Sequence, residues 1–251
     1  MVRLALLKHK PEKWDLQGNM AAFRRFARQA QARGAQLFVT CESYLDGYCV
    51  TDKPLDTQRF QEIAQDVQAS KQIECVRQVA KETAMRIVFG FSQRVEGGVK
   101  NAAILVDDSG HDRGIYHKTH LLDHDLHYLP GDDLPVFDTQ LGTIGIMICA
   151  DRRWPETART LKLKGADFIV NPTYGMHHYA NEWWMRTRAY ENETYIAFAH
   201  PMVSLVCNPT GDLEAKLSSN VSDILVHDID PMTRPSTMLT ARRPELYTLE
   251  E

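Results

Sequence analysis

Three residues with the chemistry of a base, a cation and a nucleophile each stand at the end of a short apolar segment. Glu42 comes shortly after "AQLFVT", Lys118 ends "GIYHK", and Cys149 ends "TIGIMIC". A buried carboxylate or ammonium group is costly without a partner or a function. A thiol at a strand-to-helix turn lies where a helix N-terminus favours the thiolate. Together the three groups suit nucleophilic catalysis.

Each of the three residues also has a simpler structural interpretation. Free cysteines are most often small buried hydrophobes, and single charges at strand ends are most often solvated. The chemical interpretation depends on the elements that position the residues. In open α/β sheets the carboxyl ends of the strands face the ligand crevice. We therefore expect the three side chains to meet at such strand ends.

Strand-like and helical segments alternate along the chain. "VRLALL" has the length of a buried strand, and Phe23, Phe26, Ala27 and Ala30 follow it at helical spacing. One long helical segment is predicted over residues 57–82. Three hairpin-forming runs begin at "RIVFGFS", and the later runs "DFIVNP" and "TYIAFAH" alternate with helical stretches, before "SDILVHDI" as a late edge strand. This order predicts α/β layers with mixed sheets.

Composition limits the class of protein. The 251 residues are 43% hydrophobic and 25% charged with a net charge of −4, which fits one globular domain over 1–251 and disfavours nucleic acid as a partner. Neither a membrane span nor a signal peptide is apparent. Five scattered cysteines suit a reducing compartment, so a cytoplasmic location is expected. Residues 236–251 are predicted to form a C-terminal tail or a dimer arm.

The three segments resemble the nitrilase superfamily of carbon–nitrogen hydrolases. "ESYLDGY", "YHKTHL" and "GIMICADRRWPETAR" are similar, in order and spacing, to the segments that carry the family's Glu-Lys-Cys triad. "YLPGDDLPVFDT", "GADFIVNPT" and "RTRAYENETYIA" extend the resemblance from residue 2 to about 230. It implies a four-layer α-β-β-α sandwich in which two stacked mixed β-sheets are flanked by helices. It also implies a homodimer or a higher homo-oligomer.

The resemblance further implies a division of labour among the three residues. Glu42 would act as general base, Cys149 as nucleophile, and Lys118 with the backbone N–H of Ala150 would bind the developing oxyanion. A thioester would form and then be hydrolysed by water, with no metal and no organic cofactor. The residues expected to contact the oxyanion or the substrate are Tyr48, Asp125, Ala150 and Tyr174.

Two local features need interpretation beside the resemblance. Many relatives carry an accessory glutamate where this chain has His124, so either Asp123 or Asp125 substitutes or the carboxylate is missing. Four histidines crowd this stretch, but it contains no thiolate and no zinc site is expected. The charged residues after the cysteine are predicted to brace its turn or to lie on the surface: Asp151, Arg153, Glu156 and Arg159.

Several functions remain open at this point. The leading one is hydrolysis of a small carboxamide or N-carbamoyl compound, because "CADRRWPE" is similar to the same turn in N-carbamoyl-amino-acid hydrolases. A nitrile ranks lower, since the Cys-Trp-Glu turn of true nitrilases is absent. A catalytically inactive binding or assembly module with the same fold is the alternative from another class. A papain-like hydrolase would need a histidine base that no motif supplies.

Overall fold

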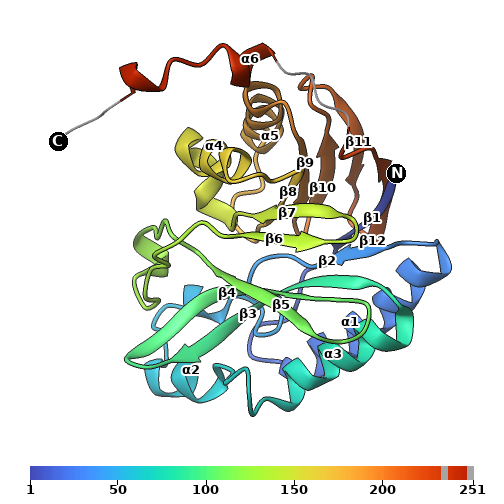
Figure 1. Cartoon of the computed structure of the whole chain (residues 1–251). Helices are drawn as coiled ribbons and strands as arrows, with labels where there is room; N and C mark the ends of the chain where they lie inside the picture. The colour runs from blue at the N-terminus through green and yellow to red at the C-terminus, as the bar shows by residue number, and fades with distance from the viewer. Residues whose placement is uncertain (233–236, 248–251) are drawn as a thin grey trace.

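Two six-stranded β-sheets lie face to face in the computed structural model, which describes residues 1–232 and 237–247 (Figure 1). The first sheet has the order β12-β1-β2-β3-β4-β5 and the second the order β11-β10-β9-β8-β7-β6. The strands of the first sheet are β1 (Val2–Lys8), β2 (Leu37–Val39), β3 (Arg86–Val95), β4 (Gly98–Val106), β5 (Asp112–His117) and β12 (Asp223–Ile229). Those of the second are β6 (Val136–Thr139), β7 (Gly142–Ile146), β8 (Phe168–Pro172), β9 (Tyr195–Ala199), β10 (Val203–Cys207) and β11 (Leu213–Ser218).

Both sheets are mixed. In the first, β1, β2 and β3 run parallel, whereas β4, β5 and β12 join them antiparallel. In the second, β7, β8 and β9 run parallel, and the remaining pairs are antiparallel. Strand β12 lies at the edge of its sheet, as "SDILVHDI" predicts.

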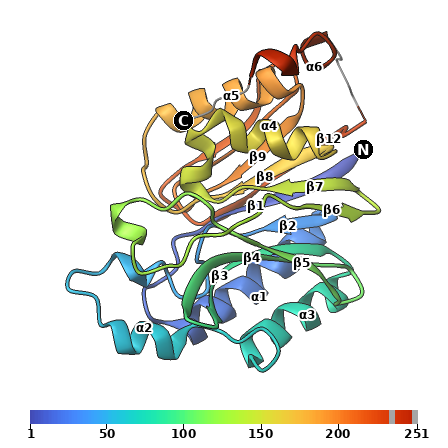
Figure 2. The same ribbon diagram turned by 60° about the vertical axis from the view of Figure 1, so that its left-hand side comes forward.

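Helices cover the outer face of each sheet (Figures 1 and 2). The helices α1 (Leu16–Ala32), α2 (Thr57–Ile63) and α3 (Lys71–Thr83) lie on the side of the first sheet, and α4 (Pro155–Leu163) and α5 (Ala180–Asn192) on that of the second. In α1 the four residues at helical spacing are all buried. The predicted four-layer sandwich with two stacked mixed sheets is therefore confirmed.

The single helix predicted over 57–82 is wrong, because the structure has two helices there. Helix α2 ends at Ile63, and α3 begins after Ser70, whose hydroxyl caps it by accepting a hydrogen bond from the N–H of Ile73. Between them Gln65 pairs with Gln93 of β3. A serine cap and a bridge to the sheet satisfy backbone groups that a continuous helix would have bonded internally.

An apolar layer fills the space between the sheets. Burying one such aliphatic side chain contributes about 1.5–3 kcal/mol, so this layer holds the two halves of the molecule together. It includes Leu6, Val88 and Leu105 from the first sheet and Ile146, Val170 and Ala197 from the second.

The C-terminal segment crosses the outside of the second sheet's helices (Figure 1). Glu193, which caps the end of α5, accepts hydrogen bonds from the backbone of Thr237 and Met238 at the start of α6 (Thr237–Thr240). Thr237 and Met238 of the predicted tail thus bond the residue that ends the chain's own α5, while residues 236 and 248–251 lie outside the described residues. No helix in the described ranges has the length and apolar character needed to span a membrane.

Candidate active site

The three residues singled out by their chemistry follow the carboxyl ends of strands and are buried. Glu42 follows β2, Lys118 follows β5, and Cys149 follows β7. Their exposed fractions are 0%, 0% and 4%. The first two come from one sheet and the thiol from the other, so the candidate site lies across the join between the sheets.

Lys118 is held between two buried carboxylates. Its Nζ lies 2.8 Å from Oε1 of Glu42 and 2.7 Å from Oδ2 of Asp125. Burial alone would lower the pKa of Lys118, but the negative charges of Glu42, Cys149 and Asp125 outweigh burial and raise that pKa above its usual value. The lysine is therefore a fixed cation at neutral pH.

Three donors orient the carboxylate of Glu42. Oε1 accepts hydrogen bonds from Lys118 and from Nδ2 of Asn101, the latter at 2.9 Å. Oε2 accepts one from the backbone N–H of Tyr174, also at 2.9 Å. Asn101 was not singled out in the sequence, and no local signal marks it, because it lies 59 residues from Glu42. Tyr174 contacts Glu42 through its backbone N–H.

The carboxylate beside the lysine belongs to Asp125. Asp125 is fully buried, and its Oδ1 accepts a 2.5 Å hydrogen bond from the hydroxyl of Tyr48. Asp123 is exposed, and Nε2 of His124 lies 3.7 Å from Asp125. Of the two aspartates that flank His124, Asp125 is thus the one that pairs with Lys118.

Cys149 stands at a strained turn between strand and helix. Its φ is +45°, a left-handed conformation that is energetically costly for residues other than glycine. A short 3₁₀ helix over Cys149–Arg153 leads to Pro155, the first residue of α4, as predicted. Burial, and then the charge of Glu42, raise the pKa of the thiol above its usual value, and the positive charges of Lys118 and Arg152 offset part of that rise.

Asp151 ties this turn to the end of β5. Its buried carboxylate accepts hydrogen bonds from the backbone N–H of Ile148 at 2.8 Å and of His120 at 3.0 Å. It also accepts from the hydroxyl of Tyr116 at 2.6 Å. Asp151 therefore bonds the segment that carries the thiol to the segment that carries Lys118.

The four histidines of residues 117–127 do not converge. His117 bonds the side chain of Gln93, and His120 stacks on Trp154 at 4.2 Å between ring centroids. Among residues 1–232 and 237–247, no group of three or more histidine, cysteine or acidic side chains is arranged to hold a metal ion.

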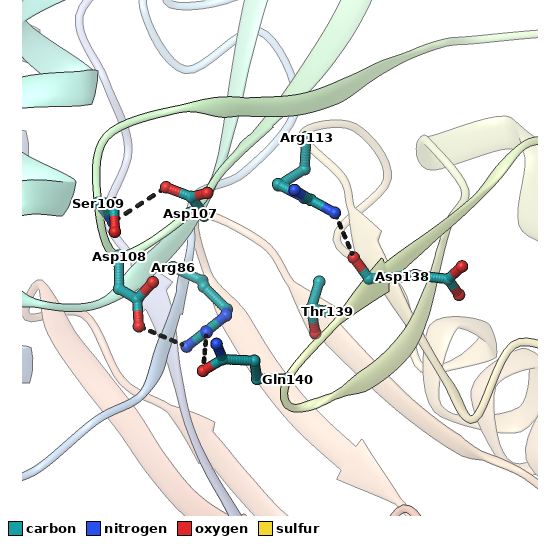
Figure 3. Close-up of a pocket in the computed structure, with 8 residues that line it drawn as sticks. All are labelled: Arg86, Asp107, Asp108, Ser109, Arg113, Asp138, Thr139 and Gln140. Atoms are coloured by element: carbon teal, nitrogen blue, oxygen red, sulfur yellow. Dashed lines mark hydrogen bonds and ion pairs between the residues drawn. The ribbon is translucent and has the colours of Figure 1, made fainter.

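A separate polar pocket of about 370 Å³ opens at the other end of the sandwich (Figure 3). Arg86, at the start of β3, bonds Asp108 and Gln140 there, and Arg113 donates to the carbonyl of Asp138. These residues lie in the β4–β5 and β6–β7 turns, at the end of β6 and at the starts of β3 and β5, opposite the strand ends that carry Glu42, Lys118 and Cys149. This pocket is therefore not part of the candidate site.

Comparison with known proteins gives consistent matches. The profile of the carbon–nitrogen hydrolase family matches residues 3–237. A protein named nitrilase from Pyrococcus abyssi is 30% identical over 92% of this chain and 90% of its own length. N-carbamoylputrescine amidase of Arabidopsis thaliana is 31% identical over 63% of this chain and 54% of its own. The crystal structure of an amidase from Nesterenkonia sp. superposes with a TM-score of 0.86 at 24% identity, covering 98% and 95% of the two chains.

These matches define the chain as an enzyme that hydrolyses carbon–nitrogen bonds. It belongs to the carbon–nitrogen hydrolase family, within the nitrilase superfamily, so the resemblance read from the sequence is confirmed.

Proposed function

We propose that this enzyme acts through a Cys149 thioester on a small carboxamide, which it cleaves to a carboxylic acid and ammonia, or on an N-carbamoyl compound, which it cleaves to ammonia and a carbamic acid that then loses carbon dioxide to leave an amine. One observation carries the proposal: the buried Glu42–Lys118 ion pair and the buried Cys149 thiol follow strand ends in the two sheets, and Asp151 bonds the segment of the thiol to that of the lysine. A base, a cation and a nucleophile that share one water-excluded site are the groups that acyl transfer from nitrogen requires.

Glu42 is the general base in this proposal. It accepts the proton of Cys149 as Sγ attacks the substrate carbonyl carbon, and it then delivers that proton to the departing nitrogen. The carbon–nitrogen bond breaks, ammonia leaves and the acyl group stays on sulfur. Glu42 next takes a proton from water, which attacks the thioester and releases the acid and the thiol.

Lys118 and the backbone N–H of Ala150 stabilise the oxyanion that forms in both steps. Removing one such donor typically lowers turnover by roughly 10²–10³. Asp125 and Tyr48 act on the substrate through Lys118, because Asp125 bonds its ammonium group and Tyr48 bonds Asp125. Tyr174 acts through Glu42, to which its N–H donates.

A nitrile is the second candidate substrate. The similarity to the Pyrococcus abyssi protein named nitrilase favours it. The similarity to N-carbamoylputrescine amidase and the "CADRRWPE" turn favour the amide or carbamoyl substrate.

We further propose that the enzyme is a cytoplasmic homodimer. All five cysteines are free, which suits a reducing compartment. On the outer face of α5, Trp183 and Tyr190 are 60% and 52% exposed, and exposed aromatic side chains of this size are typical of interfaces. Trp184, in contrast, packs against the core of the second sheet.

The test is ammonia release from a panel of carboxamides, N-carbamoyl amines, N-carbamoyl amino acids and nitriles. We expect release from one class, and loss of that release in Cys149→Ala with the fold retained by circular dichroism. Preference for nitriles would replace the amide proposal with the second candidate. Release that persists in Cys149→Ala would contradict the thioester route, and a folded protein silent on every class would favour a non-catalytic module.

A further inference from the structure

A buried guanidinium lies beside the thiol and was not singled out in the sequence. Arg152 is 1% exposed, and its Nη1 lies 3.4 Å from Sγ of Cys149. Its Nε and Nη2 both donate to Oδ1 of Asn181, at 3.2 and 2.8 Å. Its guanidinium also lies over the rings of Trp184 and Phe198, with the carbon 5.2 and 5.8 Å from their centroids.

Asn181 fixes the direction in which this guanidinium points. It lies in the first turn of α5, is buried, and donates through Nδ2 to the carbonyl of Met176. Its Oδ1 therefore faces Arg152, and the two bonds to Nε and Nη2 leave Nη1 directed at sulfur. The planar guanidinium group fixes this direction, because its five N–H groups are held in one plane and Nη1 lies on the side away from Nε and Nη2.

No carboxylate within the described part of the chain forms an ion pair with Arg152, and Asn181 is neutral. The nearby His200 does not compete as a charge: burial, and then the charges of Arg152 and His177, lower its pKa to about 3. A buried cation requires a counter-charge. Of the groups that bond Arg152 here, the Cys149 thiol is the one that becomes an anion.

Among Glu42, Asp125, Lys118 and Arg152 the charges sum to zero. Before proton transfer, Glu42 and Asp125 are negative while Lys118 and Arg152 are positive. When the S–H bond breaks and the proton joins Glu42, the electron pair stays on sulfur and the sum is unchanged. The negative charge has then moved from beside Lys118 to the sulfur that Arg152 contacts.

We propose that Arg152 is a second catalytic cation of this enzyme, one that stabilises the thiolate of Cys149 while Lys118 serves the oxyanion. The inference rests on the proposed role of Cys149 as nucleophile. The groups that act on the thiol's pKa agree with it: burial and Glu42 raise that pKa, and Lys118 and Arg152 lower it. A carboxylate on the substrate is the competing occupant, but the guanidinium's contacts to Asn181 and sulfur favour the thiolate.

The test follows alkylation of Cys149 by iodoacetamide from pH 6 to 11, because the pKa of the thiol is raised, and it is read by peptide mass spectrometry because five cysteines are present. Arg152→Met keeps an unbranched side chain that reaches as far as Nε and removes the guanidinium charge. We expect its rate at pH 7 to fall about tenfold and the midpoint of its pH profile to rise by about one unit, the shift of one lost charge-assisted contact. Arg153→Met is the matched control, because Arg153 is the exposed neighbour on the same turn, and it should alkylate like the wild type.

Iodoacetate separates the two roles of a cation. If Arg152 stabilises the thiolate, Arg152→Met slows iodoacetamide and iodoacetate alike. If Arg152→Met slows alkylation by iodoacetate alone and leaves the midpoint of the iodoacetamide pH profile unchanged, Arg152 is an anion-binding residue and the proposal is overturned.

Asn181→Ala keeps the test decisive if Arg152→Met fails to fold. It frees the guanidinium from its tether, so the midpoint should rise by a smaller amount, and an unchanged midpoint would overturn the proposal. Alkylation needs no turnover, which separates this inference from the proposed function. Slow alkylation of the wild type itself would count against an activated thiol, whereas equally fast wild type and Arg152→Met would count against Arg152 alone.

Discussion

Lys118 neutralises two carboxylates that water does not reach. Because Glu42 and Asp125 both lie within 2.8 Å of its Nζ, the lysine serves the fold as well as its proposed part in the reaction. Breaking a buried ion pair by removing one partner typically costs about 3–5 kcal/mol, since a charge is left uncompensated. Losses of stability and of activity must therefore be separated at this residue.

We expect Lys118→Met to lose both turnover and several kcal/mol of the free energy of unfolding, on the order of a broken buried pair. The double variant Lys118→Met/Asp125→Asn should regain much of the stability, because one buried charge is gone, and none of the turnover. Urea unfolding and ammonia release from the preferred substrate measure the two effects. Recovery of turnover in the double variant would show that Lys118 serves only to neutralise charge.

Among single residues, the sequence predicts the site residues that lie at strand ends. It misses the residues that reach the site only through contacts formed in the folded chain. Glu42, Lys118 and Cys149 each end an apolar run, which is a local signal. Asn101 and Arg152 carry no such signal. The first reaches Glu42 from the middle of a hairpin, and the second lies among charged neighbours that resemble a solvated helix start.

Among the elements, the loop between β5 and β6 holds Lys118 in place through a glycine. The N–H of Gly131 donates to the carbonyl of Lys118 at 2.8 Å, and a Cβ on Gly131 would lie 2.3 Å from the carbonyl oxygen of His117. Two backbones meet there with no room for a side chain. The loop therefore fixes where β5 ends.

Gly131→Ala should lower both the melting temperature and turnover, because the clash with backbone displaces the end of β5. A loss of about 1–3 kcal/mol corresponds to a shift of roughly 2–4 °C per kcal/mol for a chain of this size. Gly175→Ala is the control, since an added Cβ there meets no atom within 4 Å. Equal melting temperatures for the two variants would contradict the packing argument.

The turn between β9 and β10 depends on an uncharged histidine. Nδ1 of His200 accepts hydrogen bonds from the N–H groups of Met202 and Val203, and burial lowers the pKa of His200 from 6.5 to about 3. The unfolded chain thus binds a proton that the folded chain refuses. The contribution of neutral His200 to the free energy of unfolding is fully present above pH 6.5 and is lost as the pH falls toward 3.

His200→Asn keeps a side-chain acceptor for the N–H of Met202 and removes the titration. Between pH 7.5 and pH 5 the wild type should lose about 2 kcal/mol more of its free energy of unfolding than this variant. Urea unfolding at both pH values measures the difference. Parallel losses in the two proteins would show that His200 accepts its proton without unfolding.

Helix boundaries are harder to predict from the sequence than the site residues at strand ends. The apolar spacing of α1 predicts that helix directly, because one face packs on the sheet. The break between α2 and α3 depends on the bridge from Gln65 to Gln93. This contact joins residues far apart in the sequence, so the local apolar pattern does not reveal it. Tertiary contacts of this kind override a helical pattern.

At the scale of the whole molecule, the proposed dimer makes a prediction about the outer face of α5. Trp183→Glu places a charge in that face and should convert a dimer to a monomer in size-exclusion chromatography with light scattering. Val221→Glu is the control, because Val221 is 72% exposed in the segment between β11 and β12. A dimer that survives Trp183→Glu would move the interface elsewhere.

Mixed α/β layers follow from the order of strand-like and helical segments, but their division into two sheets does not. Both halves of the chain contain parallel strands with helical crossovers, which one large sheet would also satisfy. The stacking depends on apolar residues on both faces of β1, β2 and β8. Such a pattern indicates that both faces are buried, but it does not show whether a helix or a second sheet covers each face. The resemblance to a family supplies that information.

The return of β12 to the side of β1 sets an order for biosynthesis. On the ribosome, strands β6 to β11 emerge as one consecutive series, so the thiol's sheet can assemble as it is made. The sheet of Glu42 and Lys118 keeps an open edge at β1 until residues 223–229, the last described strand, are translated. An open edge invites pairing with other chains, so a nascent chain stalled before this point is the form most in need of a chaperone.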